Sequence, residues 1–234
     1  MSHHSSLAGR FQSSFAGFIA QLREYLGIGG RVRREPIRTP EALRAFLSSR
    51  ASFIAQTSLY GYLRTRAGQR YPELFEDDRI VASINIAKWH VWLACLSDLS
   101  AYAGGLLARG GMPSEQSGEL MRRLLDDILA ETGVPPDADA EFPAHAARVR
   151  SRIALTPWSR VEDDEGCFHE SPTALVRWAP VVEHLKRLDE NIVRSSVRFH
   201  WQEVRRELRE YLDVEAIARG FDQADRVNDS RAPT

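Results

Sequence analysis

The longest apolar stretch of the chain covers residues 77–107 and predicts one long helix. Apolar side chains occupy most of its circumference, and a helix of this kind lies in a protein core or in a bilayer. A bilayer span needs about 20 residues with few charges. Four polar residues interrupt this stretch: Asn85, Lys88, His90 and Asp98. The pattern therefore predicts a buried core helix rather than a membrane span.

Residues 1–30 carry the sharpest amphipathic pattern in the chain. At 100° per residue, eight apolar side chains fall within an arc of about 120°. They are Leu7, Phe11, Phe15, Phe18, Ile19, Leu22, Tyr25 and Leu26. A basic linker at 31–38 follows, with Arg31, Arg33 and Arg34. An amphipathic helix beside clustered arginines is typical of an interfacial membrane anchor. A helix that caps the bundle and one that enters a partner's groove fit the same pattern.

The remaining pattern predicts a helical bundle over residues 39–221 and a polar tail over 222–234. Thr39-Pro40-Glu41 has the N-cap, first-turn proline and acidic residue of a helix start. Gly104 and Gly105 are expected to loosen the end of the core helix. Pro180 is expected to kink or split a second long helical region that starts near Ser171. The predicted buried side of that region contains Trp178, Val182, Leu185, Leu188, Ile192, Phe199, Val204, Leu208 and Leu212.

No strand-like alternation of useful length occurs, so we predict an all-α fold. The expected architecture is a single bundle of about six or seven helices around two long central helices.

Charge is distributed unevenly along the chain. Residues 1–70 contain 11 arginines and three acidic residues, whereas the whole chain has a net charge of −1. This asymmetry indicates an anionic partner, pairing between the two halves, or solvated helix faces. Arginines interleaved with tyrosines at Arg64, Arg66 and Arg70 are suited to nucleic acid. A pI of 6.7 and the lack of a nucleic-acid motif argue against that partner.

Two cysteines, Cys95 and Cys167, and no recognisable secretion signal predict a cytoplasmic protein. The acidic loop 162–170 contains Cys167 and His169, and a thiolate, an imidazole and carboxylates can bind zinc. The loop lacks the second ligand pair that makes zinc motifs specific, and a solvated acidic loop or the lead-in to a helix is the favoured interpretation. We therefore predict no metal and no cofactor.

Lys88, His90 and Asp98 are the strongest candidates for a functional pocket. Buried polar groups must be paired, so each side chain needs a partner in the fold. One interpretation is an acid–base or ligand-orienting pocket. The other is an internal bridging network, in which Asp98 binds an arginine from the basic first third.

Three segments resemble an uncharacterised group of bacterial helical proteins, some of which carry the label "esterase". They are Ile54 to Gly68 (IAQTSLYGYLRTRAG), Tyr71 to Asp78 (YPELFEDD) and Ser83 to Trp89 (SINIAKW). The resemblance implies an all-helical fold, and the label implies a serine nucleophile on a strand-to-helix turn. The sequence has no Gly-x-Ser-x-Gly motif for such a turn.

The function that these patterns favour is a non-catalytic cytoplasmic adaptor or assembly factor, peripheral to the inner face of the membrane. Its expected docking residues are Phe11, Phe15, Phe18, Leu22, Arg31, Arg33 and Arg34. The expected partners are a protein and an anionic membrane surface. A hydrolase-like enzyme is the first alternative, with a pocket either at Lys88, His90 and Asp98 or at the loop of Cys167 and His169. A nucleic-acid binder is the second.

Overall fold

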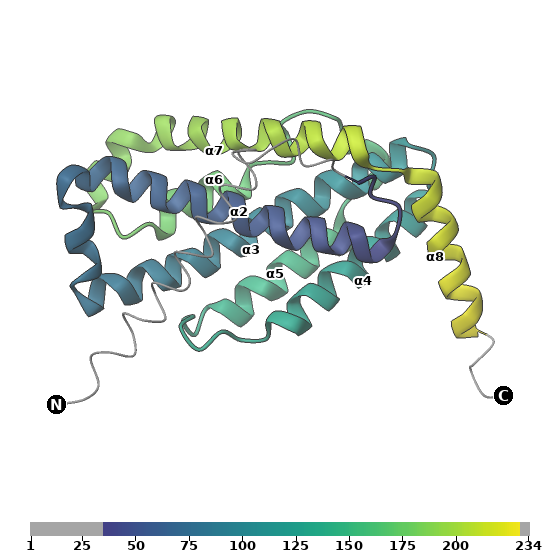
Figure 1. The fold of residues 1–234 in the computed structure, drawn as a ribbon, viewed down its shortest axis with the longest axis horizontal. Coiled ribbons are helices and arrows are strands. Elements are labelled where there is room, and N and C mark those ends of the chain that lie inside the picture. The colour runs from purple at the N-terminus through teal and green to yellow at the C-terminus, as the bar shows by residue number, and fades with distance from the viewer. Residues whose placement is uncertain (1–34, 230–234) are drawn as a thin grey trace. The chain divides into compact units, whose positions relative to one another are not determined.

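A computed structural model describes the backbone of residues 35–229 and the side chains of residues 35–222. The chain divides into Met1–Glu35 and Pro36–Thr234, and the second unit holds every element discussed below (Figure 1). The predicted N-terminal helix and its docking residues lie outside the described residues. They are Phe11, Phe15, Phe18, Leu22, Arg31, Arg33 and Arg34.

The described part of the chain is all-α, as predicted, with seven α-helices and no strand. The α-helices are α2 (Pro40–Ala67), α3 (Asp78–Arg109), α4 (Ser114–Thr132), α5 (Phe142–Leu155), α6 (Glu170–Trp178), α7 (Glu183–Tyr211) and α8 (Val214–Asp229). Two short 3₁₀ helices are η1 (Gly68–Phe75) and η2 (Trp158–Arg160). Helix α8 therefore extends beyond residue 221, where the sequence pattern predicts a polar tail.

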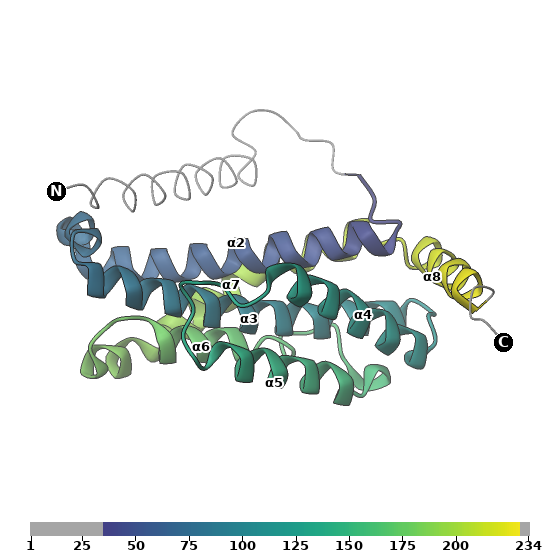
Figure 2. The ribbon, with the colours of Figure 1, turned by 90° about the horizontal axis from the view of Figure 1, so that it is seen from below.

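Helix α3 is the core helix that the sequence predicts. It packs against α2, α4, α5 and α6, and Figure 2 shows it between α2 on one side and α5 and α6 on the other. Asp77 begins the helix as its N-cap, because its side chain accepts from the backbone N–H groups of Arg79 and Ile80. Among the described residues, one helix has the length and hydropathy of a membrane span; it is α3, with 89% of its apolar window buried. That burial agrees with a place in the core.

The glycine pair of α3 does not break the helix, which continues to Arg109. The glycines instead admit two side chains of the following loop. A Cβ at Gly104 would overlap the Trp158 ring, and a Cβ at Gly105 would overlap Val161. Gly118 on α4 faces the same indole, with its Cβ position 2.6 Å from Trp158 Nε1. These glycines therefore form a notch that holds the loop after α5 against α3 and α4.

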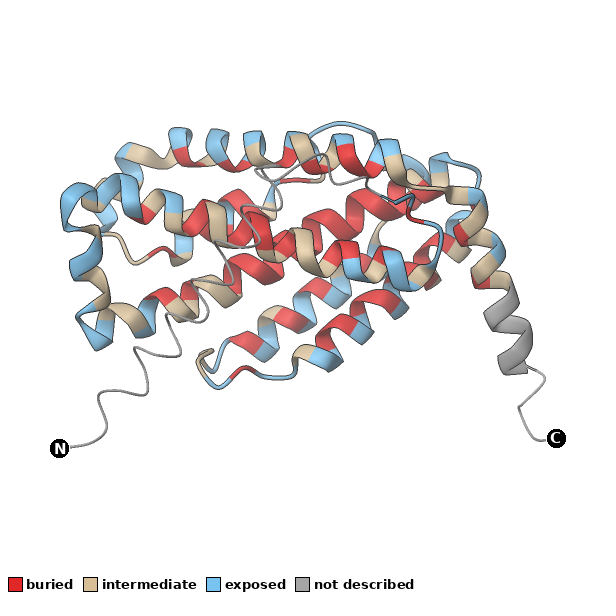
Figure 3. Cartoon of the chain, viewed as in Figure 1, coloured by how far each residue is buried: buried red, intermediate tan, exposed pale blue. Residues whose placement is uncertain are grey.

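Pro180 separates α6 from α7, as predicted. The predicted buried side of α7 is right at Val204 and Leu208, which are buried, but wrong in the preceding part of the helix. Leu188, Ile192 and Phe199 are 73%, 72% and 68% exposed. The buried side is formed by Val193, Val197, Trp201, Val204 and Leu208. Figure 3 shows the buried residues of α7 only on the side that faces the other helices. Helix α7 therefore lies at the periphery, and the prediction of two long central helices is not confirmed.

Candidate functional site

Lys88 lies at the edge of the bundle, where it meets the connection between α4 and α5. Its Nζ is 3.1 Å from Asp137 Oδ2, and the neighbouring Trp89 indole N–H donates to Asp137 Oδ1 at 2.7 Å. Partial burial opposes ionisation of Asp137, but the Trp89 hydrogen bond and the Lys88 charge hold its pKa below the usual value. The Lys88–Asp137 ion pair therefore links α3 to the connection between α4 and α5.

His90 is fully buried and lies among three side chains from other parts of the chain. Its ring stacks on Trp178 of α6, with ring centroids 3.6 Å apart and ring planes 6° apart. Its Nε2 is 2.9 Å from Asp139 Oδ1, and its Nδ1 is 2.8 Å from Nδ1 of His145 on α5. Both ring nitrogens are thus engaged.

These distances define the direction of the hydrogen bonds. The Asp139 carboxylate can only accept, so His90 donates from Nε2 and keeps a lone pair on Nδ1. His145 must then donate from its Nδ1, which leaves the lone pair of His145 on Nε2. Asp139, His90 and His145 form a chain in which a carboxylate orients one imidazole and that imidazole orients the next. In hydrolases a carboxylate orients the general base directly; here His90 lies between Asp139 and His145.

His145 is neutral at pH 7. Its burial, together with the proximity of the His90 imidazole and the Arg148 guanidinium, lowers its pKa from the ordinary 6.5 to about 4. Glu170 opposes this shift and Arg177 reinforces it. In its neutral form, Nε2 of His145 can accept a proton.

The lowered pKa of His145 predicts a specific loss of stability in mild acid. Between pH 6.5 and pH 4 the unfolded chain binds a proton at this residue and the folded chain does not, so stability falls as the pH decreases. After allowance for solvent screening, we expect about 1 kcal/mol less stability at pH 5 than at pH 7 from this residue. Urea unfolding at both pH values measures this change. His145→Asn keeps a donor near the Nδ1 position and cannot titrate, so its pH dependence should be smaller by that amount. Equal pH dependence in the two proteins would contradict the assignment.

Asp98 is fully buried, with an exposed fraction of 0%. Its Oδ1 accepts from Arg152 Nη1 at 2.7 Å, and its Oδ2 accepts from the Ser171 backbone N–H at 2.8 Å and hydroxyl at 2.7 Å. Trp201 Nε1 donates to the same hydroxyl at 3.0 Å. Burial raises the pKa of Asp98, and Arg152 and Ser171 oppose that rise. The carboxylate therefore joins α3 to α5, to the start of α6 and, through Trp201, to α7.

The partner of Asp98 differs from the expected one. The sequence interpretation assigned it an arginine from the basic first third, whereas the structure provides Arg152 of α5. Arg152 also donates to the Ser97 hydroxyl at 3.0 Å and to the Cys167 carbonyl at 2.8 Å. The interpretation of a bridging network is thus correct for Asp98, but the network joins α3 to α5, α6 and α7 rather than to the basic first third.

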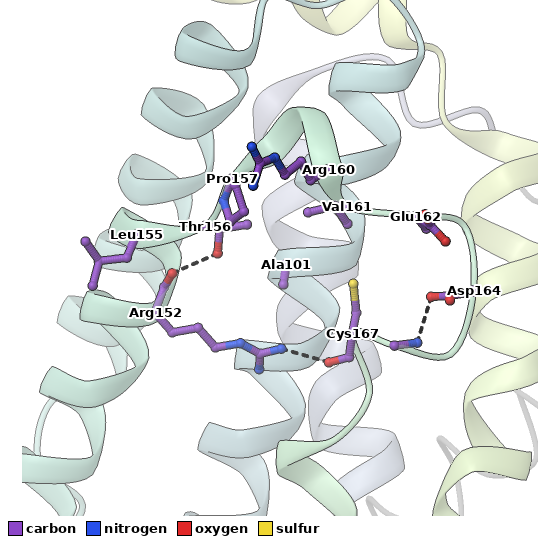
Figure 4. Close-up of a pocket in the computed structure, with 11 residues that line it drawn as sticks. Ala101, Arg152, Leu155, Thr156, Pro157, Arg160, Val161, Glu162, Asp164 and Cys167 are labelled. Atoms are coloured by element: carbon purple, nitrogen blue, oxygen red, sulfur yellow. Dashed lines mark hydrogen bonds between the residues drawn. The ribbon is translucent and has the colours of Figure 1, made fainter.

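Arg152 also borders a cavity of about 490 Å³ on the other side of the network. Figure 4 shows Arg152 extending from α5 toward the loop that carries Cys167. The other lining residues are Ala101, Leu155, Thr156, Pro157, Arg160, Val161, Glu162, Asp164 and Gly166. Burial raises the pKa of the Cys167 thiol, so this thiol is not activated as a thiolate. Lys88, His90 and Asp98 are absent from the lining, and they do not form one pocket.

The acidic loop and the arginine cluster are also engaged in pairings. Asp163 accepts from Tyr102 and from Arg209, and His169 Nδ1 lies 3.1 Å from the Gly166 carbonyl. Within the described part of the chain, no group of three or more His, Cys, Asp or Glu residues is placed to hold a metal ion. Arg66 binds Asp189 and Arg70 binds Glu73, so two of the three nucleic-acid candidates have acidic partners.

Sequence reasoning missed His145, Arg152 and the roles of Asp139 and Trp178. The sequence pattern predicts Trp178 only as a buried residue of the second long helical region. The sequence shows that His90 and Asp98 need partners. It does not show which residues they are, because the partners lie about 50 positions further along the chain and reach α3 only when α5 packs on it.

Comparison with known proteins adds no assignment, because no family model, curated protein or solved structure matches this chain.

Proposed function

We propose that this chain is a non-catalytic cytoplasmic adaptor with one contact to a protein and one to an anionic membrane surface. The observation that carries this proposal is the outer side of α7, where Leu188, Ile192 and Phe199 are exposed in one row. Large apolar side chains exposed together on one side of a helix are typical of interaction surfaces. The charged groups of α3 support a non-catalytic role, because Lys88 and Asp98 are engaged in bridges between helices.

The membrane contact is assigned to residues 1–34 on their sequence. Three phenylalanines of one face, Phe11, Phe15 and Phe18, precede Arg31, Arg33 and Arg34. Apolar side chains of such a helix enter the acyl boundary, and each arginine near anionic head groups contributes about 1 kcal/mol.

Vesicle sedimentation tests the membrane contact. The full chain should sediment with anionic vesicles and not with neutral ones, and salt should weaken the binding. Replacing Arg31, Arg33 and Arg34 together by glutamine should weaken binding about 100-fold, at about 1 kcal/mol for each arginine. The matched control replaces three exposed arginines of the bundle, Arg79, Arg122 and Arg148, and should bind as the unchanged chain does. Equal binding by both triple variants, or no binding by the full chain, would overturn the membrane contact.

A hydrolase-like enzyme is the second candidate, and the Asp139–His90–His145 chain is the observation that favours it. His145 would act as the general base through Nε2. The variant His145→Asn separates the two functions. A hydrolase would lose turnover of a p-nitrophenyl ester while remaining folded at pH 7, and an adaptor would show no turnover to lose.

A further inference from the structure

Helix α7 has two opposite apolar sides, and only one of them is covered in the described structure. The inner side packs against α2 and α6 through Val197 and Trp201. The outer side carries Leu188, Ile192 and Phe199. No charged residue lies on the outermost line of the helix between Leu185 and Gln202. This outer side has the composition of a helix–helix contact.

The spacing of the outer side is that of a coiled coil. Alternating steps of three and four residues connect six positions, which are Leu185, Leu188, Ile192, Ser195, Phe199 and Gln202. These steps match alternating a and d positions of a heptad, starting with a at Leu185. A β-branched residue at a and leucine at d favour two strands, and here they are Ile192 and Leu188. We call this row of six residues the outer seam.

The residues beside the outer seam differ in charge on its two sides. Position g is occupied by His184, Asn191 and Arg198, and position e by Asp189, Ser196 and Glu203. Of these, Asp189 is bound to Arg66 of α2. In a parallel pair each g position faces the e position five residues later in the partner helix. Arg198 would then face Glu203 of the partner, and Asn191 would face Ser196. The helix is therefore complementary to a second copy of itself in parallel register.

An antiparallel pair would be less favourable. It would bring g positions beside g positions and e positions beside e positions. Arg198 would then lie beside g positions of the partner helix and Glu203 beside its e positions, so these two residues would not pair. Charges at e and g set the orientation of coiled coils in this way.

We propose that a second copy of this chain occupies the outer seam, and that the two α7 helices pair in parallel about a two-fold axis that runs along the seam. The inference rests on the proposed use of α7 as a protein contact, and it names the partner. Fewer than three heptads make a small interface, so the dimer should dissociate on dilution.

The mass of the full chain, measured by sedimentation velocity over a range of concentrations, tests the pairing. We expect a monomer–dimer equilibrium, and Ile192→Ser should raise the dissociation constant about tenfold or more, since two buried isoleucines are lost per dimer. Arg198→Glu and Glu203→Arg should each raise it about fivefold, and the double variant should return it to within about twofold of the original. Arg187→Glu, at a position outside the seam, is the matched control and should leave it unchanged. The parallel pair would be overturned if the chain remained monomeric. It would also be overturned if the double variant raised the dissociation constant by the product of the two single effects.

A single engineered cysteine tests the register. Cys167→Ser removes the half-buried native thiol, and Cys95 is buried. In that background Ser195→Cys should form an interchain disulfide on mild oxidation, because parallel pairing places the two d positions together. Ser83→Cys, on the exposed side of α3, should not. No disulfide at 195 would overturn the proposed register. Vesicle binding by the full chain is measured separately, so the pairing and the membrane contact fail independently.

Discussion

Asp98→Ala is expected to lower the free energy of unfolding by about 3–5 kcal/mol, which is the usual cost of removing one partner of a buried ion pair. The carboxylate is fully buried and accepts from Arg152 and from the backbone and hydroxyl of Ser171. Its removal leaves the Arg152 guanidinium, which is 17% exposed, beside an empty acceptor site. It also leaves the start of α6 without its acceptor, because Asp98 receives the first N–H groups of that helix.

Chemical denaturation with a matched pair of variants measures this effect. Asp126→Ala removes the carboxylate that binds Arg150, and that pair is 59% and 45% exposed. The control should therefore cost less than about 1 kcal/mol. The combination of Asp98→Leu with Arg152→Met should cost less than Asp98→Ala, since it leaves no buried charge unpaired. Equal losses for Asp98→Ala and Asp126→Ala would show that the network does not stabilise the fold.

The elements most accurately predicted from the sequence are those in which a single local signal determines the structure. Thr39 accepts from the Ala42 N–H at 3.1 Å, as an N-cap should, and Pro180 separates α6 from α7. The apolar circumference of 77–107 predicts the core helix because no side of it is suited to solvent. In each case the signal lies within a few residues of the element that it specifies.

Helix α7 shows where a local signal is ambiguous. Its sequence has apolar rows on two opposite sides, one through Ile192 and Phe199 and the other through Val197 and Trp201. Periodicity alone cannot select between them. The prediction followed the outer row as far as Phe199, where it is wrong, and the inner row at Val204 and Leu208, where it is confirmed. The packing of α7 on α2 and α6 decides which row is buried. The apolar row that stays exposed is then a candidate contact surface, because no other helix of the described chain packs against it.

The candidate site shows a different limit. Burial physics correctly requires partners for His90 and Asp98, but it does not name them. His145 and Arg152 both lie on α5, seven residues apart, and they reach α3 because two turns of α5 pack along it. Neither residue is marked in the sequence by a motif. Such a network can be recognised only once the helices have been placed.

Gly104→Ala is expected to lower the free energy of unfolding by about 2 kcal/mol, although alanine is the better helix former. A Cβ at this position would overlap two atoms of the Trp158 ring and would lie 2.8 Å from Met121 Cγ. The indole must then leave its notch between α3 and α4. The loop that contains Trp158 and lines the cavity must move with it.

The matched control for this prediction is Gly61→Ala on α2, because a Cβ at Gly61 meets nothing within 4 Å. There the same substitution should stabilise the chain by about 1 kcal/mol, the difference in helix propensity. Thermal unfolding of both variants should therefore give melting temperatures that move in opposite directions. Adding Trp158→Phe to Gly104→Ala should cost less than the two single changes together, since the smaller ring relieves the overlap. If Gly104→Ala instead stabilises the chain as Gly61→Ala does, the notch is not closed around Trp158. The close approach of this loop would then not be the reason for glycine at positions 104 and 105.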